Sequence, residues 1–86
     1  MNMESEELIG YIYSSSLRRD VIKFLEKNVR ARPTEIAKSI GKYQSHISNV
    51  LIAFEKEGLV KCITPQKRTW RVYTLTEVGK NVSKRL

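Results

Sequence analysis

The apolar residues of this sequence recur mostly at the three- and four-residue spacing of an amphipathic helix. One stripe runs through residues 17–28 and consists of Leu17, Val21, Phe24 and Leu25. A second runs through residues 44–57 and consists of Ile47, Val50, Leu51 and Phe54. Because residues three and four apart share a helix face, both segments are predicted to be helices packed on a core. Ser15 or Ser16 can cap the first helix, and Gly58 ends the second.

The segment between these helices carries the signals of a short helix and a tight turn. Pro33 is favourable at a first helical position, and "PTEIAKSI" then places apolar residues on one side. Gly41 suits the left-handed conformation that commonly ends a helix. Only Gly41, Lys42 and Tyr43 separate this helix from the next one. A glycine-containing turn of this length between two helices is typical of a helix-turn-helix.

The two ends of the chain add further elements. Residues 6–13, "EELIGYIY", are predicted to form a short helix apolar enough to need a partner surface. Residues 59–64 and 69–75 are rich in β-branched and aromatic residues and are predicted to be strands joined by the turn "PQKR". Thr76 can cap a last helix, "EVGKNVSKRL". This order predicts an α+β, mainly helical fold: a winged helix-turn-helix with a two-stranded β-hairpin wing. A chain of 86 residues is expected to form one domain, 1–86.

The charge of the chain is strongly positive and unevenly distributed. The net charge is +7, yet the first 16 residues carry only three charged side chains, all acidic. The other 70 residues hold all 16 Lys and Arg against six acids, a net charge of +10. A body this positive attracts polyanions, with nucleic acid the leading candidate, although a soluble basic protein without such a partner has a similar composition.

Several classes of function lack support in the sequence. A single cysteine excludes an internal disulfide and a multi-cysteine zinc site, and one histidine without clustered carboxylates is a poor metal site. No catalytic motif and no phosphate-cradling glycine loop is present, so we expect neither an enzyme nor a cofactor. No small-molecule effector is evident. The chain has no apolar run of membrane-spanning length and no basic signal-peptide start, so we expect a cytoplasmic protein without a membrane partner.

Three segments resemble the winged-helix transcriptional regulators of bacteria and archaea, broadly of the MarR and ArsR type. These segments are "RRDVIKFL", "TEIAKSIGKYQSHISNVLIAFEKEGLV" and "RVYTLTEVGKNV". The resemblance covers about residues 17–82 and implies a recognition helix, here 44–57, that enters the major groove of double-stranded DNA. It also implies a wing, 59–75, that reaches the DNA backbone or the minor groove. The chain lacks the long dimerisation helices and the paired-cysteine metal-sensing motif of larger members.

Polar side chains gather at the front of the predicted recognition helix. With Ile47 set as the inward direction, a rotation of about 100° per residue directs Ser45, Asn49, Ile52 and Lys56 away from the core. Side chains of this kind can bond to base edges, and Asn or Gln can pair bidentately with adenine. The residues expected to face bases are Gln44, Ser45, His46 and Asn49. The alternative is that Ser45 caps the helix and the others are only solvated. Ile52 could contact a thymine methyl or a protein, although isolated exposed isoleucines are common.

A second set of residues is expected to contact the DNA backbone or the minor groove. Its members are Arg32, Lys38, Lys42, Tyr43, Ser48, Lys67, Arg68 and Arg71. Lys67 and Arg68 fall at the predicted wing tip, where cations suit phosphates or a narrow minor groove. Charges at such a tip also protect a sheet edge from unwanted pairing, which is the alternative for these two residues.

The N-terminal segment, 1–14, is predicted to contact a second subunit. Its apolar residues exceed what the core of residues 17–78 needs, and spare apolar faces suggest an interface. The residues assigned to this interface are Leu8, Ile9, Tyr11 and Ile12. The alternative is that the segment folds back on its own domain. A two-fold homodimer would read a palindrome with half-sites about 34–36 Å apart.

Three functions therefore compete. The first is a regulator that binds specific sequences of double-stranded DNA. The second is an architectural nucleoid protein that binds DNA mainly through phosphates, with a steep salt dependence and little discrimination among sequences. The third is a winged helix used as a protein-interaction module, against which the positive body and the polar helix front both argue.

Overall fold

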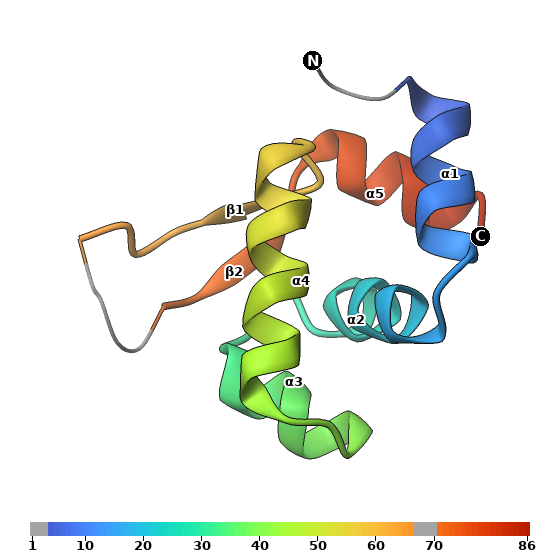
Figure 1. Cartoon of the computed structure of the whole chain (residues 1–86). Coiled ribbons are helices and arrows are strands. Elements are labelled where there is room, and N and C mark those ends of the chain that lie inside the picture. The colour runs from blue at the N-terminus through green and yellow to red at the C-terminus, as the bar shows by residue number, and fades with distance from the viewer. Residues whose placement is uncertain (1–3, 67–70) are drawn as a thin grey trace.

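The computed structural model describes residues 4–66 and 71–86 and contains, in these residues, five helices and one two-stranded antiparallel sheet (Figure 1). The elements are α1 (Ser5–Tyr13), α2 (Ser16–Lys27), α3 (Pro33–Ile40), α4 (Gln44–Lys56), β1 (Val60–Cys62), β2 (Tyr73–Leu75) and α5 (Glu77–Lys84). Helices α3 and α4 are joined by the short turn, and the hairpin follows α4. The chain is a winged helix-turn-helix, which confirms the predicted fold class.

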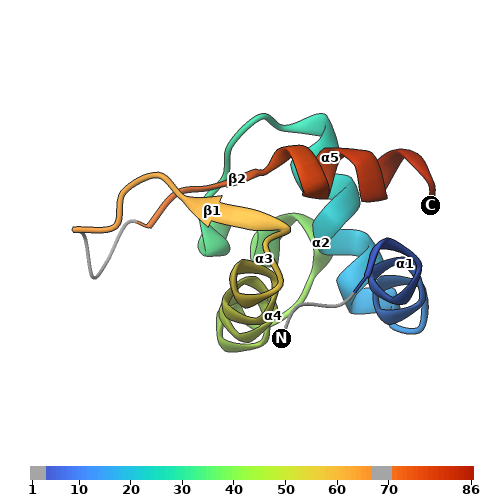
Figure 2. The same ribbon diagram turned by 90° about the horizontal axis from the view of Figure 1, so that it is seen from above.

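The hairpin projects from one side of the molecule, and α1 lies on the opposite side in both views (Figures 1 and 2). The two strands of the hairpin pair so that Val60 lies opposite Leu75 and Cys62 lies opposite Tyr73. Both described strands are shorter than the predicted 59–64 and 69–75, although the Ile63 N–H still bonds to the Val72 carbonyl at 2.8 Å. At the next position the Val72 N–H bonds to the Thr64 hydroxyl oxygen at 3.0 Å, so a side chain takes the place of a backbone acceptor.

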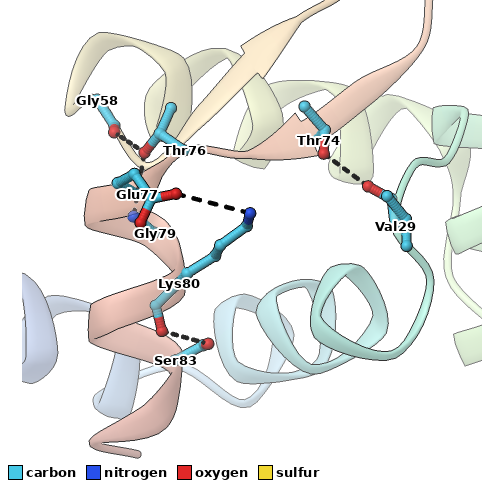
Figure 3. A network of polar contacts seen from close by, with 8 residues as sticks. All are labelled: Val29, Gly58, Thr74, Thr76, Glu77, Gly79, Lys80 and Ser83. Carbon is cyan, nitrogen blue, oxygen red and sulfur yellow. Dashed lines mark hydrogen bonds and ion pairs between the residues drawn. The ribbon is translucent and has the colours of Figure 1, made fainter.

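A short bridge adds a third segment to this sheet. Ala31 and Tyr73 exchange two backbone hydrogen bonds of 3.0 and 2.9 Å, and the Thr74 hydroxyl donates to the Val29 carbonyl at 2.6 Å (Figure 3). The connection between α2 and α3 is thereby fixed to β2. No strand was predicted for this connection, because the bridge involves so few residues.

The buried residues form one cluster to which every helix and both strands contribute. Its largest fully buried side chains are Phe54, Ile12, Ile22, Ile36, Ile47, Leu51, Leu59, Val21 and Val60. Ile47, Leu51 and Phe54 are the inward face of α4, as predicted, and Val50 is half-buried beside them. Removing this much apolar surface from water is the main stabilising contribution to so small a fold. The burial of these side chains also determines which face of α4 is exposed to solvent.

The N-terminal segment packs on its own domain, which was the alternative to the predicted subunit contact. Leu8 and Ile12 are 2% and 0% exposed within the chain's own core. Tyr11 is half-buried, and its ring meets Phe54 of α4 edge-on with the ring centroids 6.3 Å apart. Ile9 is also half-buried and packs against the same core. The segment therefore folds back on its own domain, because α1 covers apolar surface that α2, α4 and α5 leave open.

Two arginines of α2 fasten α1 in place. The Arg18 guanidinium donates to the Tyr11 carbonyl at 2.9 Å and lies 3.9 Å from the centre of the Tyr11 ring. Arg19 donates to the Tyr13 carbonyl and also lies over the Tyr13 ring. Since α1 has no basic residue in its own last turn, these side chains supply the positive charge that suits a helix C-terminus.

A polar network joins the end of α4, the hairpin and α5 (Figure 3). The Thr76 hydroxyl accepts a hydrogen bond from the Gly79 N–H at 3.0 Å, so Thr76 caps α5 as predicted. The same hydroxyl donates to the Gly58 carbonyl at 2.5 Å. Gly58, with φ of 74°, occupies the left-handed region that favours glycine, and it ends the turn after α4. Thr76 therefore holds both ends of the β-hairpin together.

Candidate nucleic-acid interface

The front of α4 presents the polar side chains that the sequence predicts to face bases. Gln44, Ser45, His46 and Asn49 are all exposed, while Ile47 between them is fully buried. Ser48 is half-buried at the margin. The core contacts of the apolar face hold the helix, so its polar residues are presented on a rigid support.

The outward arc of α4 extends along the whole helix. Ser45, Asn49, Ile52 and Lys56 are exposed, in agreement with the helical rotation that directs them away from Ile47. Lys56 was not among the predicted site residues, although it shares this arc. Because it lies on the same arc as Ser45 and Asn49, Lys56 is added to the candidate interface.

The turn between α3 and α4 orients this front. Gly41 has φ of 70°, and the Lys42 N–H donates to the Ala37 carbonyl at 3.0 Å, so the left-handed helix ending is confirmed. Tyr43 is the N-cap residue of α4, and no side chain forms a cap hydrogen bond there. The alternative in which Ser45 caps the helix is therefore not what the structure shows. The first N–H groups of α4 remain a positive end suited to an anionic partner.

Tyr43 is 77% exposed, and its ring meets the His46 ring edge-on at 5.8 Å between centroids. Tyr43 is predicted to contact the DNA backbone and His46 to contact bases, so this ring contact links the two predicted sets of residues. Lys42 is exposed beside Tyr43. The turn and the first turn of α4 thus form one continuous polar and cationic surface.

Arg32 and Lys38, the two residues at α3 that are predicted to contact the DNA backbone, have different surroundings. Lys38 is exposed, whereas Arg32 is half-buried and its Nε lies 3.5 Å from Glu35 Oε1. Glu35 also accepts from the Arg32 backbone N–H at 2.8 Å, which fixes the start of α3. The carboxylate offsets part of the Arg32 charge, so Lys38 is the stronger candidate for a phosphate contact.

On the wing, Lys67 and Arg68 lie outside the described residues. Arg71 is half-buried, and a hydrogen bond to the Tyr73 side chain raises the pKa of Arg71 from its ordinary value. Arg71 therefore keeps its positive charge throughout the pH range in which a folded protein is studied. Among the predicted site residues, the structure shows a contact between Tyr43 and His46.

Within 4–66 and 71–86, no three His, Cys, Asp or Glu side chains gather as a group that could hold a metal ion. None of the helices in this part of the chain combines the length and the hydrophobicity needed to cross a membrane.

The fold is similar to a solved structure of ZitR from Lactococcus lactis, a mutant in its apo form. The two chains superimpose with a TM-score of 0.72 at 16% sequence identity, and the match covers 93% of this chain. It covers 64% of the ZitR chain, so this chain spans less than two thirds of that length. Such a likeness supports the winged-helix fold. Neither a protein-family model nor a curated protein matches the sequence.

Proposed function

We propose that this chain is a DNA-binding transcriptional regulator, of the MarR or ArsR type, that recognises specific sequences in double-stranded DNA. The observation that carries the proposal is the exposed polar front of α4, formed by Gln44, Ser45, His46 and Asn49 on a helix whose other face is fully packed. Hydrogen-bonding side chains at the start of the second helix of a helix-turn-helix are the groups that this architecture uses to read base edges.

In the proposed complex α4 enters the major groove. Asn49 and Gln44 each offer an amide that can pair bidentately with adenine, while Ser45 and His46 can donate to or accept from a base edge. These groups carry the sequence preference. The helical rotation that buries Ile47 directs Ser45 and Asn49 outward, while Gln44 and His46 are exposed in the first turn of the helix.

The remaining candidate residues position the protein on the backbone. Lys42, Tyr43 and Ser48 flank the front of α4, Lys38 belongs to α3, and Arg32 is the N-cap residue that precedes α3. Lys67, Arg68 and Arg71 are assigned to the wing, with contacts to phosphates or the minor groove. Contacts of this kind fix the register of the protein on DNA but carry little sequence information.

The homodimer stays a prediction. Its original support is reduced, because Leu8 and Ile12 are buried in the chain's own core and Tyr11 contacts Arg18 and Phe54. A dimer would reveal itself in the preferred DNA, since two-fold symmetry requires a palindrome with half-sites one helical turn apart.

The test is selection of binding sites from random duplex DNA at physiological salt. An enriched sequence is the expected result, and a palindrome would add the homodimer. Binding without an enriched sequence would favour the alternative, an architectural nucleoid protein. Absence of binding would favour the second alternative, a protein-interaction module.

Paired substitutions then separate base reading from charge. Asn49→Ala is expected to relax the preference at one base pair by about 1–3 kcal/mol, because one specific base contact is lost. Lys42→Ala is expected to weaken all sequences alike, since a phosphate contact does not depend on sequence. Affinities for the selected site and for its single-base variants provide the measurement. An unchanged specificity profile in the Asn49 variant would contradict the assignment of this residue.

A further inference from the structure

Ile52 is the one apolar residue on the outward arc of α4. Its side chain is 46% exposed, and the other members of the arc, Ser45, Asn49 and Lys56, are polar and exposed. The rotation of the helix directs Ile52 about 140° away from Ile47, so it takes no part in the buried face. An aliphatic group is thereby placed among the side chains that are proposed to meet DNA.

The position of Ile52 along the helix also suits the groove. It follows Asn49 by three residues, a rise of about 4.5 Å, which is close to the stacking distance of about 3.4 Å between base pairs. A base pair next to the one contacted by Asn49 is therefore within reach of Ile52. The only apolar group that a base displays in the major groove is the C5-methyl of thymine.

The composition of α4 agrees with this chemistry. The helix, "QSHISNVLIAFEK", contains no arginine, the side chain most often used to read guanine. Its amide side chains favour adenine, whose partner base is thymine. Amide and aliphatic groups on one arc are thus complementary to neighbouring A·T pairs.

We propose that Ile52 is a specificity-determining residue that contacts the C5-methyl group of a thymine adjacent to the base pair read by Asn49. This inference rests on the proposed function. It narrows the preferred DNA to sites in which α4 faces consecutive A·T pairs, with at least one thymine methyl directed at Ile52.

The experiment uses the full chain and the duplex recovered by selection. Each thymine of that duplex is replaced in turn by deoxyuridine, which removes the methyl group and preserves the Watson–Crick pairing. At one thymine per bound protein chain, the affinity of the unaltered protein is expected to fall about fourfold, the value of one buried methyl group. In Ile52→Ala, this difference between thymine and uracil is expected to disappear.

Val78→Ala is the matched control. Val78 is 45% exposed, nearly the same as Ile52, but it belongs to α5 and lies outside the interface. This variant is expected to retain the full thymine preference. Alanine is a good helix former at both exposed positions, so both variants are expected to fold.

The outcomes separate the inference from the proposed function. If a motif is selected but no uracil substitution lowers the affinity, the inference fails and the regulator stands. If the uracil penalty is unchanged in Ile52→Ala, another group reads the methyl and the inference also fails. If selection recovers no motif, both the proposed function and the inference are overturned.

Discussion

Gly79 allows α5 to approach the backbone of the strand that follows α4. A Cβ atom at this position would overlap the Leu59 carbonyl oxygen and lie 3.1 Å from Leu75 Cδ2. The obstacle is mainly backbone, and Leu59 is itself fixed because its N–H bonds to the Phe54 carbonyl and its carbonyl accepts from Thr76. The absence of a side chain at Gly79 is therefore a packing requirement of this fold.

Gly79→Ala is accordingly expected to lower the free energy of unfolding by about 2–3 kcal/mol, because the added methyl forces α5 away from β1. Gly10→Ala is the control: among the described residues, nothing outside its own helix lies within 4 Å of that site. Alanine there is expected to raise the stability by roughly 0.5–1 kcal/mol. Urea unfolding of both variants measures the difference, and equal effects would show that the Leu59 contact imposes no constraint.

The Thr76 hydroxyl acts as both acceptor and donor, toward Gly79 and Gly58. Thr76→Val keeps the shape but removes both hydrogen bonds, and it is expected to cost about 1–2 kcal/mol of stability. Thr76→Ser, which retains the hydroxyl, is expected to cost much less. Thermal or urea unfolding is the measurement, and a Thr76→Val variant as stable as the unaltered protein would contradict the role of the hydroxyl.

At the scale of elements, α1 depends on α2 for its attachment. The helix is nine residues long, too short to be stable alone in water, and carries no cation in its last turn. Arg18 and Arg19 supply cations from α2, while Leu8 and Ile12 supply the buried surface. Part of the basic charge of α2 therefore stabilises the attachment of α1.

Arg18→Ala is expected to loosen α1 selectively. Losing the bond to the Tyr11 carbonyl and the contact with its ring should lower the free energy of opening α1 by about 1 kcal/mol. Hydrogen exchange of the α1 amides is the measurement, with α4 expected to exchange as before. Lys23→Ala, an exposed substitution on the same helix, is the control, and an equal change there would contradict the role of Arg18.

For the whole molecule, we expect the affinity for DNA to come mainly from electrostatic attraction. The sequence preference is expected to come from the polar side chains of α4. Cations of α3, the turn and the wing should release counterions from DNA, so that affinity falls with salt by about 0.9 log units per log unit for each phosphate contacted. The net charge of +10 outside the first 16 residues supports such a term. Base reading by α4 should add discrimination without altering this slope.

Lys38→Ala is expected to reduce the salt slope by about one, because one phosphate contact is removed. Lys84→Ala removes the same charge from the last turn of α5, away from the proposed interface, and should leave the slope unchanged. Affinities measured across a range of salt concentrations compare the two. A slope that responds equally to both variants would mean that DNA experiences only the net charge.

The local features of the fold could be predicted from the sequence. The apolar stripe of α4, the left-handed Gly41, the turn through Lys42 and Tyr43, and the Thr76 cap all depend on residues within a few positions of one another. Helical spacing and capping chemistry act at that range, so the chain by itself determined its helices. The same rotation indicated that Ser45 and Asn49, two residues of the candidate site, face outward from α4.

Only the tertiary structure decided where the spare apolar surface goes. Whether Leu8 and Ile12 meet a second subunit or their own core depends on the gap left by α2, α4 and α5, which no local pattern records. The bridge between Ala31 and Tyr73 and the close approach of Gly79 to Leu59 depend equally on distant segments. Spacing along the chain specifies a face, whereas the partner of that face is set by the packing of the whole molecule.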